Sequence, residues 1–127
     1  MSVATSLPQY LLTPPGVTAR VGAVSTVEAE YCFEPSFPGF EGHFPAKPIV
    51  PGIAQIMAVV HTVCHDRAGQ LKNIKRCKFT RPVRPMEHLK ILAEVTDNGT
   101  ERHCKATLWA DGEPSANISI IITMQQV

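Results

Sequence analysis

One histidine lies just before the most apolar stretch of the chain, in a position from which it could act as a base. His43 stands in the sequence EGHFPAKPIVPG, among several prolines and glycines. The unperturbed pKa of a histidine is close to neutral pH, so its ring can accept and release a proton. Gly52 ends this stretch and opens an apolar run, where the unpaired amide hydrogens of a helix start would face an anionic group. From these residues alone, His43 is either a base near a polarising helix end or a loop histidine that is hydrogen-bonded for structure.

A second group of titratable side chains lies further along, in the sequence HTVCHD. His61, Cys64 and His65 have the i, i+3, i+4 spacing that puts side chains on one face of a helix. Zinc usually requires four ligands, and no second cluster of ligand-type residues accompanies these three. The sequence predicts no metal site, and it points to no cofactor.

These residues require a helix to position them, and the sequence predicts one from about Pro51 to Arg67. Proline suits the first turn because it has no amide hydrogen to lose, and Gly69 is placed to end the helix. The segment is apolar on nearly every side. A helix of this kind must be wrapped by other structure.

The segments before the helix are predicted to be extended or irregular. SLPQYLL is expected to form a short opening helix that ends at the Pro14-Pro15-Gly16 break. Residues 17–33 are expected to be extended, and residues 34–52 contain too many prolines and glycines for a regular element. Apolar side chains alternate with polar ones in the period-2 pattern of a half-buried strand, at Val27, Ala29, Tyr31 and Phe33.

The remainder of the chain is predicted to be antiparallel sheet. IKRCKFT, HLKILAEV, RHCKATLWA and ANISIIITM have strand patterns, and the residues between them favour turns. Asp97-Asn98-Gly99-Thr100 contains the Asn-Gly pair of a two-residue hairpin, and DGEP is a second turn. The order of elements favours an α+β fold in which a curved antiparallel sheet wraps one long central helix.

Composition limits the classes of function that need to be considered. The 127 residues suit one domain, 1–127, and the net charge of +1 gives no basis for binding nucleic acid. No segment is apolar over the roughly 20 residues of a membrane span, and no secretory signal is evident, so a cytoplasmic location is expected. Without a Cys-x-x-Cys pair, the four cysteines are expected to be buried free thiols: Cys32, Cys64, Cys77 and Cys104.

Two stretches resemble a known family, the 3-hydroxyacyl-(acyl carrier protein) dehydratases of the FabA/FabZ type, which have the hotdog fold. The first is Gly42-His43-Phe44-Pro45 with Pro48 and then Pro51-Gly52. The second is KFTRPVRPMEHLKI, which follows the predicted helix. The resemblance extends from about Leu7 to the end of the sequence.

The resemblance implies an elimination reaction and a role for several residues. His43 would take the α-proton of a 3-hydroxyacyl thioester, and the backbone N–H of Gly52 would polarise the thioester carbonyl. The backbone carbonyl near Ile49 would hold the His43 ring in one tautomer. Phe44, Pro51 and Met57 would lie along the bound acyl chain. Because glycine has no Cβ, a ligand can approach the backbone at position 52 closely.

The family's acid is absent from this sequence. A carboxylate fourteen positions after the histidine is usual in the family, and Met57 occupies that position here. A thioether can neither donate a proton nor hold a water as a carboxylate does. His61, which replaces the family's usual glutamine one turn later, is the first candidate substitute. Glu41 and Asp66 are weaker ones, because each is readily explained as a solvated surface charge.

Three functions remain open at this point. The first is a dehydratase in which His43 works with water or with His61, and the second is a non-catalytic acyl-thioester-binding subunit. The third, a hotdog thioesterase, usually also employs a carboxylate. The implied partners are an acyl carrier protein or CoA thioester, and a second subunit in a homodimer, a higher homo-oligomer or a heterodimer with an acid-bearing relative. An acidic carrier protein could contact Lys47, Arg76, Lys78, Arg81 and Arg84.

Overall fold

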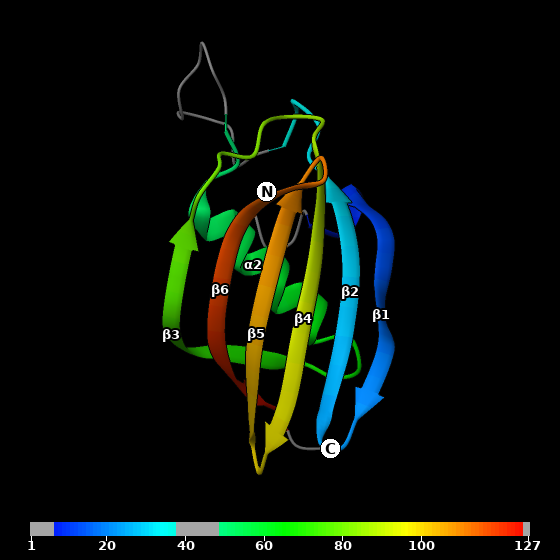
Figure 1. Ribbon diagram of the computed structural model, residues 1–127, viewed down its shortest axis with the longest axis vertical. Coiled ribbons are helices and arrows are strands. Elements are labelled where there is room, and N and C mark those ends of the chain that lie inside the picture. Colours follow the sequence, from blue (N-terminus) through cyan, green and yellow to red (C-terminus); the bar gives the residue numbers. More distant parts are fainter. Residues whose placement is uncertain (1–6, 38–48, 126–127) are drawn as a thin grey trace.

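Six antiparallel strands form one curved sheet, and a single helix lies across one face of it (Figure 1). The computed structural model describes residues 7–37 and 49–125. The strand order is β1-β2-β4-β5-β6-β3, with every neighbouring pair antiparallel. The elements are η1 (Leu7–Tyr10), β1 (Leu11–Val21), β2 (Val24–Cys32), α2 (Gly52–Val63), β3 (Gly69–Phe79), β4 (His88–Asn98), β5 (Glu101–Ala110) and β6 (Glu113–Met124). This architecture confirms the predicted sheet-and-helix fold.

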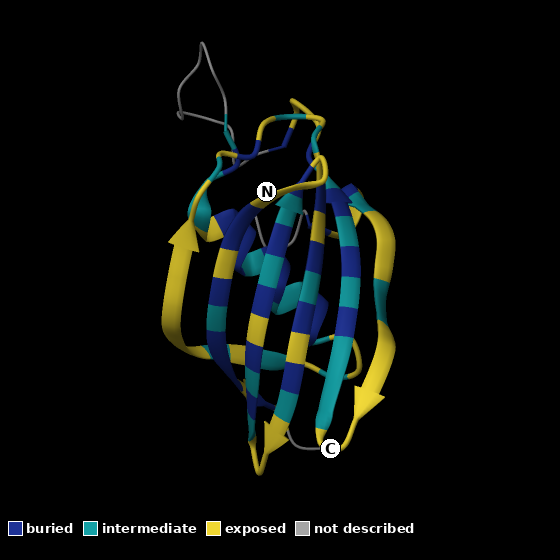
Figure 2. Ribbon diagram, in the orientation of Figure 1, coloured by how far each residue is buried: buried dark blue, intermediate teal, exposed yellow. Residues whose placement is uncertain are grey.

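The core lies between α2 and the sheet face that it covers. Buried and less buried residues alternate along the central strands, as the period-2 side-chain geometry of a strand requires (Figure 2). The predicted alternation in β2 is confirmed, because its three inward residues Val27, Ala29 and Tyr31 are each at most 2% exposed, as is Phe33 just after the strand. Side chains of α2 complete the core at Ala54, Ala58, Val59 and Val63.

Both turns predicted in the second half of the chain are present. The first hairpin is shifted by one residue from the prediction: its loop is Gly99-Thr100, with Gly99 at φ +64°, and Asn98 is the last residue of β4, where it pairs with Glu101. Asp111 and Gly112 both have positive φ and join β5 to β6. Two consecutive residues at positive φ suit the twist of a tight hairpin, which explains the Asp-Gly pair.

The prediction of a break at Pro14-Pro15-Gly16 is wrong, because β1 runs through these residues. β1 is an edge strand whose register shifts between Thr13 and Gly16. Proline is tolerated at bulges and on edges, where its missing amide hydrogen is not needed by a neighbouring strand. The predicted opening helix is only the short 3-10 turn η1. The expected single extended segment is two strands, joined at Gly22, which has φ +60°.

The helix ends earlier than predicted, at Val63 instead of near Arg67. The Cys64 N–H donates to the Val60 carbonyl and closes the last turn. Gly69 does not end the helix but starts β3, where it pairs with Met124. A Cβ on Gly69 would lie 2.6 Å from the Ile122 Cγ2, so close packing of this strand requires a glycine here.

All four cysteines are free, as predicted, but they are not all buried. Cys104 is buried, two are half-buried, and Cys77 is exposed on β3 because that strand forms the other edge of the sheet. In the part of the chain that the structure describes, no helix is both long enough and apolar enough to span a bilayer.

Candidate active site at the two ends of the central helix

The start of α2 presents amide hydrogens for which the described part of the chain supplies no recorded backbone acceptor. Pro51 caps the helix, and its carbonyl accepts from the N–H groups of Ala54 and Gln55 at 3.0 and 3.2 Å. Within residues 7–37 and 49–125, no hydrogen bond to the N–H of Gly52 or Ile53 is recorded. These two donors lie at the positive end of the helix dipole and are suited to bind a developing negative charge.

Gly52 stands at this helix start, as predicted, and its lack of a side chain matters for packing. A Cβ at Gly52 would lie 3.0 Å from the Cε2 and Cζ atoms of Phe79, which stands at the end of β3. The Phe79 ring therefore covers the Cα of Gly52 closely while itself remaining 43% exposed. This edge of the helix start has an apolar wall.

The chain just before the helix is held in place by two hydrogen bonds. The Val50 N–H donates to the Val83 carbonyl at 2.7 Å, and the Gln55 Nε2 donates to the Val50 carbonyl at 3.2 Å. Gln55 is 3% exposed, and its Oε1 has no hydrogen-bond partner among the described residues. Sequence reasoning missed Gln55, although a single amide in an apolar helix is a signal that it could have used.

The predicted base and its neighbours cannot be placed. His43, Phe44, Glu41 and Lys47 lie outside the described residues, so their roles stay predictions.

Met57 lies on the side of α2 that the sheet covers least. It is half-buried and packs against the core. The same side carries Ile53, which is 58% exposed, followed by half-buried Val60, His61 and Cys64. Because the wrapped side of the helix is fully buried, this stripe is where a ligand or another chain can approach.

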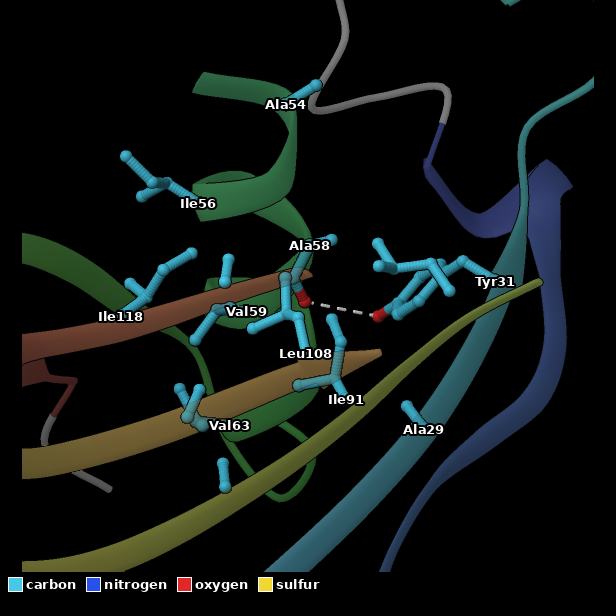
Figure 3. Close-up of a cluster of buried hydrophobic side chains, with 14 of the residues drawn as sticks. Ala29, Tyr31, Ala54, Ile56, Ala58, Val59, Val63, Ile91, Leu108 and Ile118 are labelled. Carbon is cyan, nitrogen blue, oxygen red and sulfur yellow. Dashed lines mark hydrogen bonds between the residues drawn. The ribbon is translucent and has the colours of Figure 1, made fainter. Parts of the chain in front are cut away.

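His61 is bonded to the sheet through a buried tyrosine. Its Nδ1 lies 2.7 Å from the hydroxyl of Tyr31 on β2. That hydroxyl also lies 3.0 Å from the Thr62 Oγ1 and 3.3 Å from the Ala58 carbonyl, the contact drawn in Figure 3. Burial lowers the pKa of His61, and it raises the pKa of Tyr31 to about 12. Tyr31 was predicted only as a core residue, because no sequence pattern links it to His61.

His61 and Gly52 of one chain are too far apart to act on the same atoms. Nine residues separate them on α2, which corresponds to about 13.5 Å along the helix axis. A 3-hydroxyl group is only two carbon atoms from its thioester carbonyl carbon. His61 therefore cannot contact the hydroxyl of a substrate whose carbonyl binds Gly52 of the same chain.

A cleft of about 490 Å³ opens beside His61, between the second half of α2 and β1. Its apolar wall includes Leu11, Pro14, Pro15 and Val60. Its titratable side chains are His61, Cys64 and His65, and burial raises the pKa of the Cys64 thiol, which keeps it protonated at neutral pH. Among the described residues, no group of three histidine, cysteine or acidic side chains is arranged to hold a metal ion.

Asp66 is a surface carboxylate, as the sequence suggested, and it is also an ion-pair partner. Its carboxylate lies 2.7 and 3.2 Å from two nitrogens of Arg102, whose side chain is only 4% exposed. The same guanidinium binds Asp97 and donates to the Val63 carbonyl, so it caps the C-terminal end of α2. Asp66 is therefore occupied in structure and is a poor candidate for an acid.

The basic residues expected to face a carrier protein differ in their surroundings. Arg76 and Lys78 lie on the exposed edge strand β3 and line a shallow hollow with Lys105. Arg81 is instead paired with Glu87 and Glu113, at 2.5 and 3.1 Å. Arg84 is exposed, and no ion pair of its side chain is recorded among the described residues. The predicted cations that the structure leaves available to a partner are therefore Arg76, Lys78 and Arg84.

Comparison with known proteins places the chain in a dehydratase family. The profile of the ApeI-like family, described as ApeI dehydratase, matches residues 20–113. A 3-hydroxyacyl-[acyl-carrier-protein] dehydratase FabZ of Bacillus cereus (strain AH820) is 33% identical over 95 residues, covering 67% of this chain and 66% of the relative. The FabZ of Bacillus pumilus (strain SAFR-032) is 30% identical with the same coverage. The chain thus spans slightly less than two thirds of the length of these curated relatives.

Solved structures with the same fold include related enzymes at low sequence identity. The dehydratase heterocomplex ApeI:P from Xenorhabdus doucetiae has a TM-score of 0.64 and 22% identity, covering 87% of this chain and 99% of that one. The (R)-hydratase from A. caviae, involved in PHA biosynthesis, has a TM-score of 0.66 and 10% identity, covering 85% and 100%. At these identities the likeness concerns the fold, which is hotdog.

Proposed function

Because the chain belongs to the ApeI-like dehydratase family, we propose that it takes part in the dehydration of 3-hydroxyacyl thioesters borne by an acyl carrier protein or by CoA. The observation that carries this proposal is the start of α2. Gly52 and Ile53 present two amide hydrogens for which no acceptor is recorded among the described residues, directly after the loop sequence that contains His43. This arrangement suits the stabilisation of charge on a thioester oxygen.

In the proposed reaction, His43 removes the α-proton while the Gly52 N–H polarises the thioester carbonyl. The electron pair of the C–H bond becomes the new double bond, and the C–O bond at the β-carbon breaks. The departing hydroxide takes up a proton and leaves as water. The products are the 2-enoyl thioester and water. Proline at positions 45, 48 and 51 would restrict the loop and so aim the base before the substrate binds.

The proton for the departing hydroxide must come from a group other than Met57. We propose that a second, related chain supplies a carboxylate at the corresponding position, so that one site of a heterodimer contains His43 and the partner's acid. The dehydratase neighbour from Xenorhabdus doucetiae is described as a heterocomplex, which supports a paired arrangement. A homodimer in which water or His61 replaces the acid is the alternative within the same function.

Two surfaces are suited to receive the second chain. The uncovered stripe of α2 is apolar over its first two turns, at Ile53 and Met57. β3 is an edge strand with exposed apolar side chains at Ile74 and Phe79. Because Phe79 also contacts Gly52, the two surfaces meet at the proposed site.

A non-catalytic acyl-binding subunit is the second candidate, and the observation that favours it is Met57. Its side chain packs against the core instead of standing in a polar cavity. Such a subunit would stabilise an active partner and would contribute no base. The two candidates differ in whether His43 is needed.

The test is an assay of hydration and dehydration with acyl-carrier-bound and CoA-bound substrates, using the chain alone and co-expressed with each related hotdog subunit of its genome. We expect His43→Ala to lower kcat by at least about 100-fold in the active assembly, the effect of losing a general base. His88→Ala is a matched control, because this histidine is exposed on β4. Unchanged turnover in folded His43→Ala would refute the base assignment and favour the non-catalytic subunit.

A further inference from the structure

The hydroxyl of Tyr31 is the centre of a small polar cluster inside an apolar core. Tyr31 and Thr62 are both 0% exposed, and α2 supplies every partner of the Tyr31 hydroxyl. The cluster contains three contacts of 3.0 Å or less: Thr62 Oγ1 to the Ala58 carbonyl at 2.8 Å, Tyr31 Oη to Thr62 Oγ1 at 3.0 Å, and Tyr31 Oη to His61 Nδ1 at 2.7 Å. The Tyr31 Oη also lies 3.3 Å from the Ala58 carbonyl oxygen. Each contact needs one hydrogen between its two atoms.

Counting hydrogens determines where the proton of His61 lies. The Ala58 carbonyl can only accept, so the 2.8 Å contact uses the hydroxyl hydrogen of Thr62. Thr62 can then only accept from Tyr31, and the 3.0 Å contact uses the hydroxyl hydrogen of Tyr31. The hydrogen in the 2.7 Å contact must therefore be on the Nδ1 of His61. The hydrogen of Tyr31 is then shared between Thr62 Oγ1 and the Ala58 carbonyl oxygen, 3.3 Å away. The opposite assignment, in which Tyr31 donates to His61, leaves both of these oxygen–oxygen contacts without a hydrogen.

We infer that Tyr31 is a positioning residue that keeps the proton of neutral His61 on Nδ1 and so presents Nε2 as a hydrogen-bond acceptor to the cleft between α2 and β1. The ring borders that cleft, and no described residue is recorded as a partner of Nε2. Burial lowers the pKa of His61, which agrees with a neutral ring at pH 7. The other titratable groups around the ring are Tyr31, Cys64 and His65, and none of the described residues that line the cleft is a carboxylate.

An unprotonated Nε2 on His61 resembles the family's carboxylate in one respect, because an ionised carboxylate also only accepts hydrogen bonds. Met57 has neither a strong donor nor a strong acceptor, whereas His61, one turn later on the same helix, presents an acceptor of fixed direction. An O–H group, from water or from a substrate hydroxyl, is the kind of ligand that such an atom binds. The structural part of the inference stands by itself, and its effect on turnover rests on the proposed function.

The direct test is the tautomer of His61, measured from the ¹⁵N and ¹H resonances of its imidazole ring at pH 7.5 and assigned with His61→Gln. We expect Nδ1 to be protonated and Nε2 unprotonated in the natural protein. In Tyr31→Phe, which keeps the ring in the core and leaves the Thr62–Ala58 bond intact, we expect the proton to move to Nε2. Tyr10→Phe is the matched control, since Tyr10 belongs to the same aromatic cluster but has no recorded contact with His61.

Protonation at Nε2 in the natural protein would overturn the inference, and this result needs no variant to fold. An unchanged tautomer in Tyr31→Phe would overturn the role of Tyr31. With an active assembly, Tyr31→Phe should lower kcat about tenfold, the effect of one hydrogen bond, with KM unchanged. The natural protein should lose activity as the pH falls through the pKa of His61, because the protonated Nε2 no longer accepts. An inactive protein with the expected tautomers would refute the proposed function while supporting this inference.

Discussion

Replacing Arg102 by methionine should be among the most destabilising single changes in this chain. The guanidinium makes five hydrogen bonds to three groups: two to Asp66, two to Asp97 and one to the Val63 carbonyl. Methionine has a similar length and an apolar stem, so Arg102→Met removes the charge while filling part of the space. Two carboxylates then lose their counter-charge, and the end of α2 loses its cap.

The size of the effect follows from burial. Breaking a buried ion pair by removing one partner costs roughly 3–5 kcal/mol. Asp66 and Asp97 remain 46% and 47% exposed, so water can solvate them in part. We therefore expect the lower end of that range, about 3 kcal/mol less free energy of unfolding. Arg102→Lys keeps the charge but cannot bind both carboxylates in bidentate fashion. Its free energy of unfolding should therefore lie between those of the natural protein and Arg102→Met.

Urea titration at pH 7 measures the difference through the midpoint at constant m-value. Arg20→Met is the matched control, since Arg20 is on the edge strand β1 and its recorded contact is an exposed hydrogen bond to Ser25. Its effect should stay within about 0.5 kcal/mol. A loss below about 1 kcal/mol in Arg102→Met would refute the view that this cluster secures the helix end.

Acid provides a second measurement on the same pair of proteins. The Arg102 guanidinium lowers the pKa of Asp66 to about 2 from the ordinary 3.8, and it lowers the pKa of Asp97 as well. A carboxyl group whose pKa is lower in the folded state stabilises that state above its unfolded pKa. This contribution is lost as the pH falls through the folded value. Between about pH 4 and pH 2, the stability difference between natural protein and Arg102→Met should therefore shrink. A constant difference would contradict the ion-pair explanation.

Two further substitutions test the positions around the helix. If only the acid is missing, Met57→Glu should raise dehydratase turnover of the chain without a partner. Burying part of a carboxylate also lowers the stability of the fold. A folded variant without any gain in turnover would show that the site needs more than one residue. Gly69→Ala should lower the free energy of unfolding by about 1–3 kcal/mol, because its Cβ would lie 2.6 Å from the buried Ile122 side chain. In urea titrations Gly16→Ala is its control, since nothing lies within 4 Å of a Cβ there, and equal effects would argue against the clash.

Local patterns were sufficient to predict the central strands, the helix and the tight turns. The alternation in β2 and the Asp-Gly pair at residues 111–112 act through neighbouring residues, so their structure follows from sequence alone. The end of α2 could not be predicted in this way, because the side chain of Arg102 on β5 caps it. Nothing in the sequence near Val63 indicates this contact. β1 was missed for a similar reason, since its prolines are acceptable only because the strand lies on an edge.

The candidate site likewise contains residues that local sequence predicts and residues whose setting depends on distant parts of the chain. Gly52 was predicted from the Pro-Gly pair that opens an apolar run, and it stands at the helix start. The setting of His61 depends on Tyr31, thirty residues earlier, and only the packing of β2 against α2 brings the two together. The acid that we propose as the partner of His43 is outside local reasoning in the same sense, because it would come from a second chain.

The position of β3 in the sheet also affects how the chain reaches its fold. β3 follows α2 in sequence, yet its ladder partner is β6, with Gly69 opposite Met124 and Phe79 opposite Ala116. The β4–β5 and β5–β6 hairpins close short loops, whereas joining β3 to β6 encloses both hairpins and carries a larger entropic cost. The ribosome therefore releases α2 and β3 before it releases β6, the strand that pairs with β3. A nascent chain halted within β6 keeps that edge open to other sheets, which makes this the stage at which aggregation or chaperone capture competes with folding.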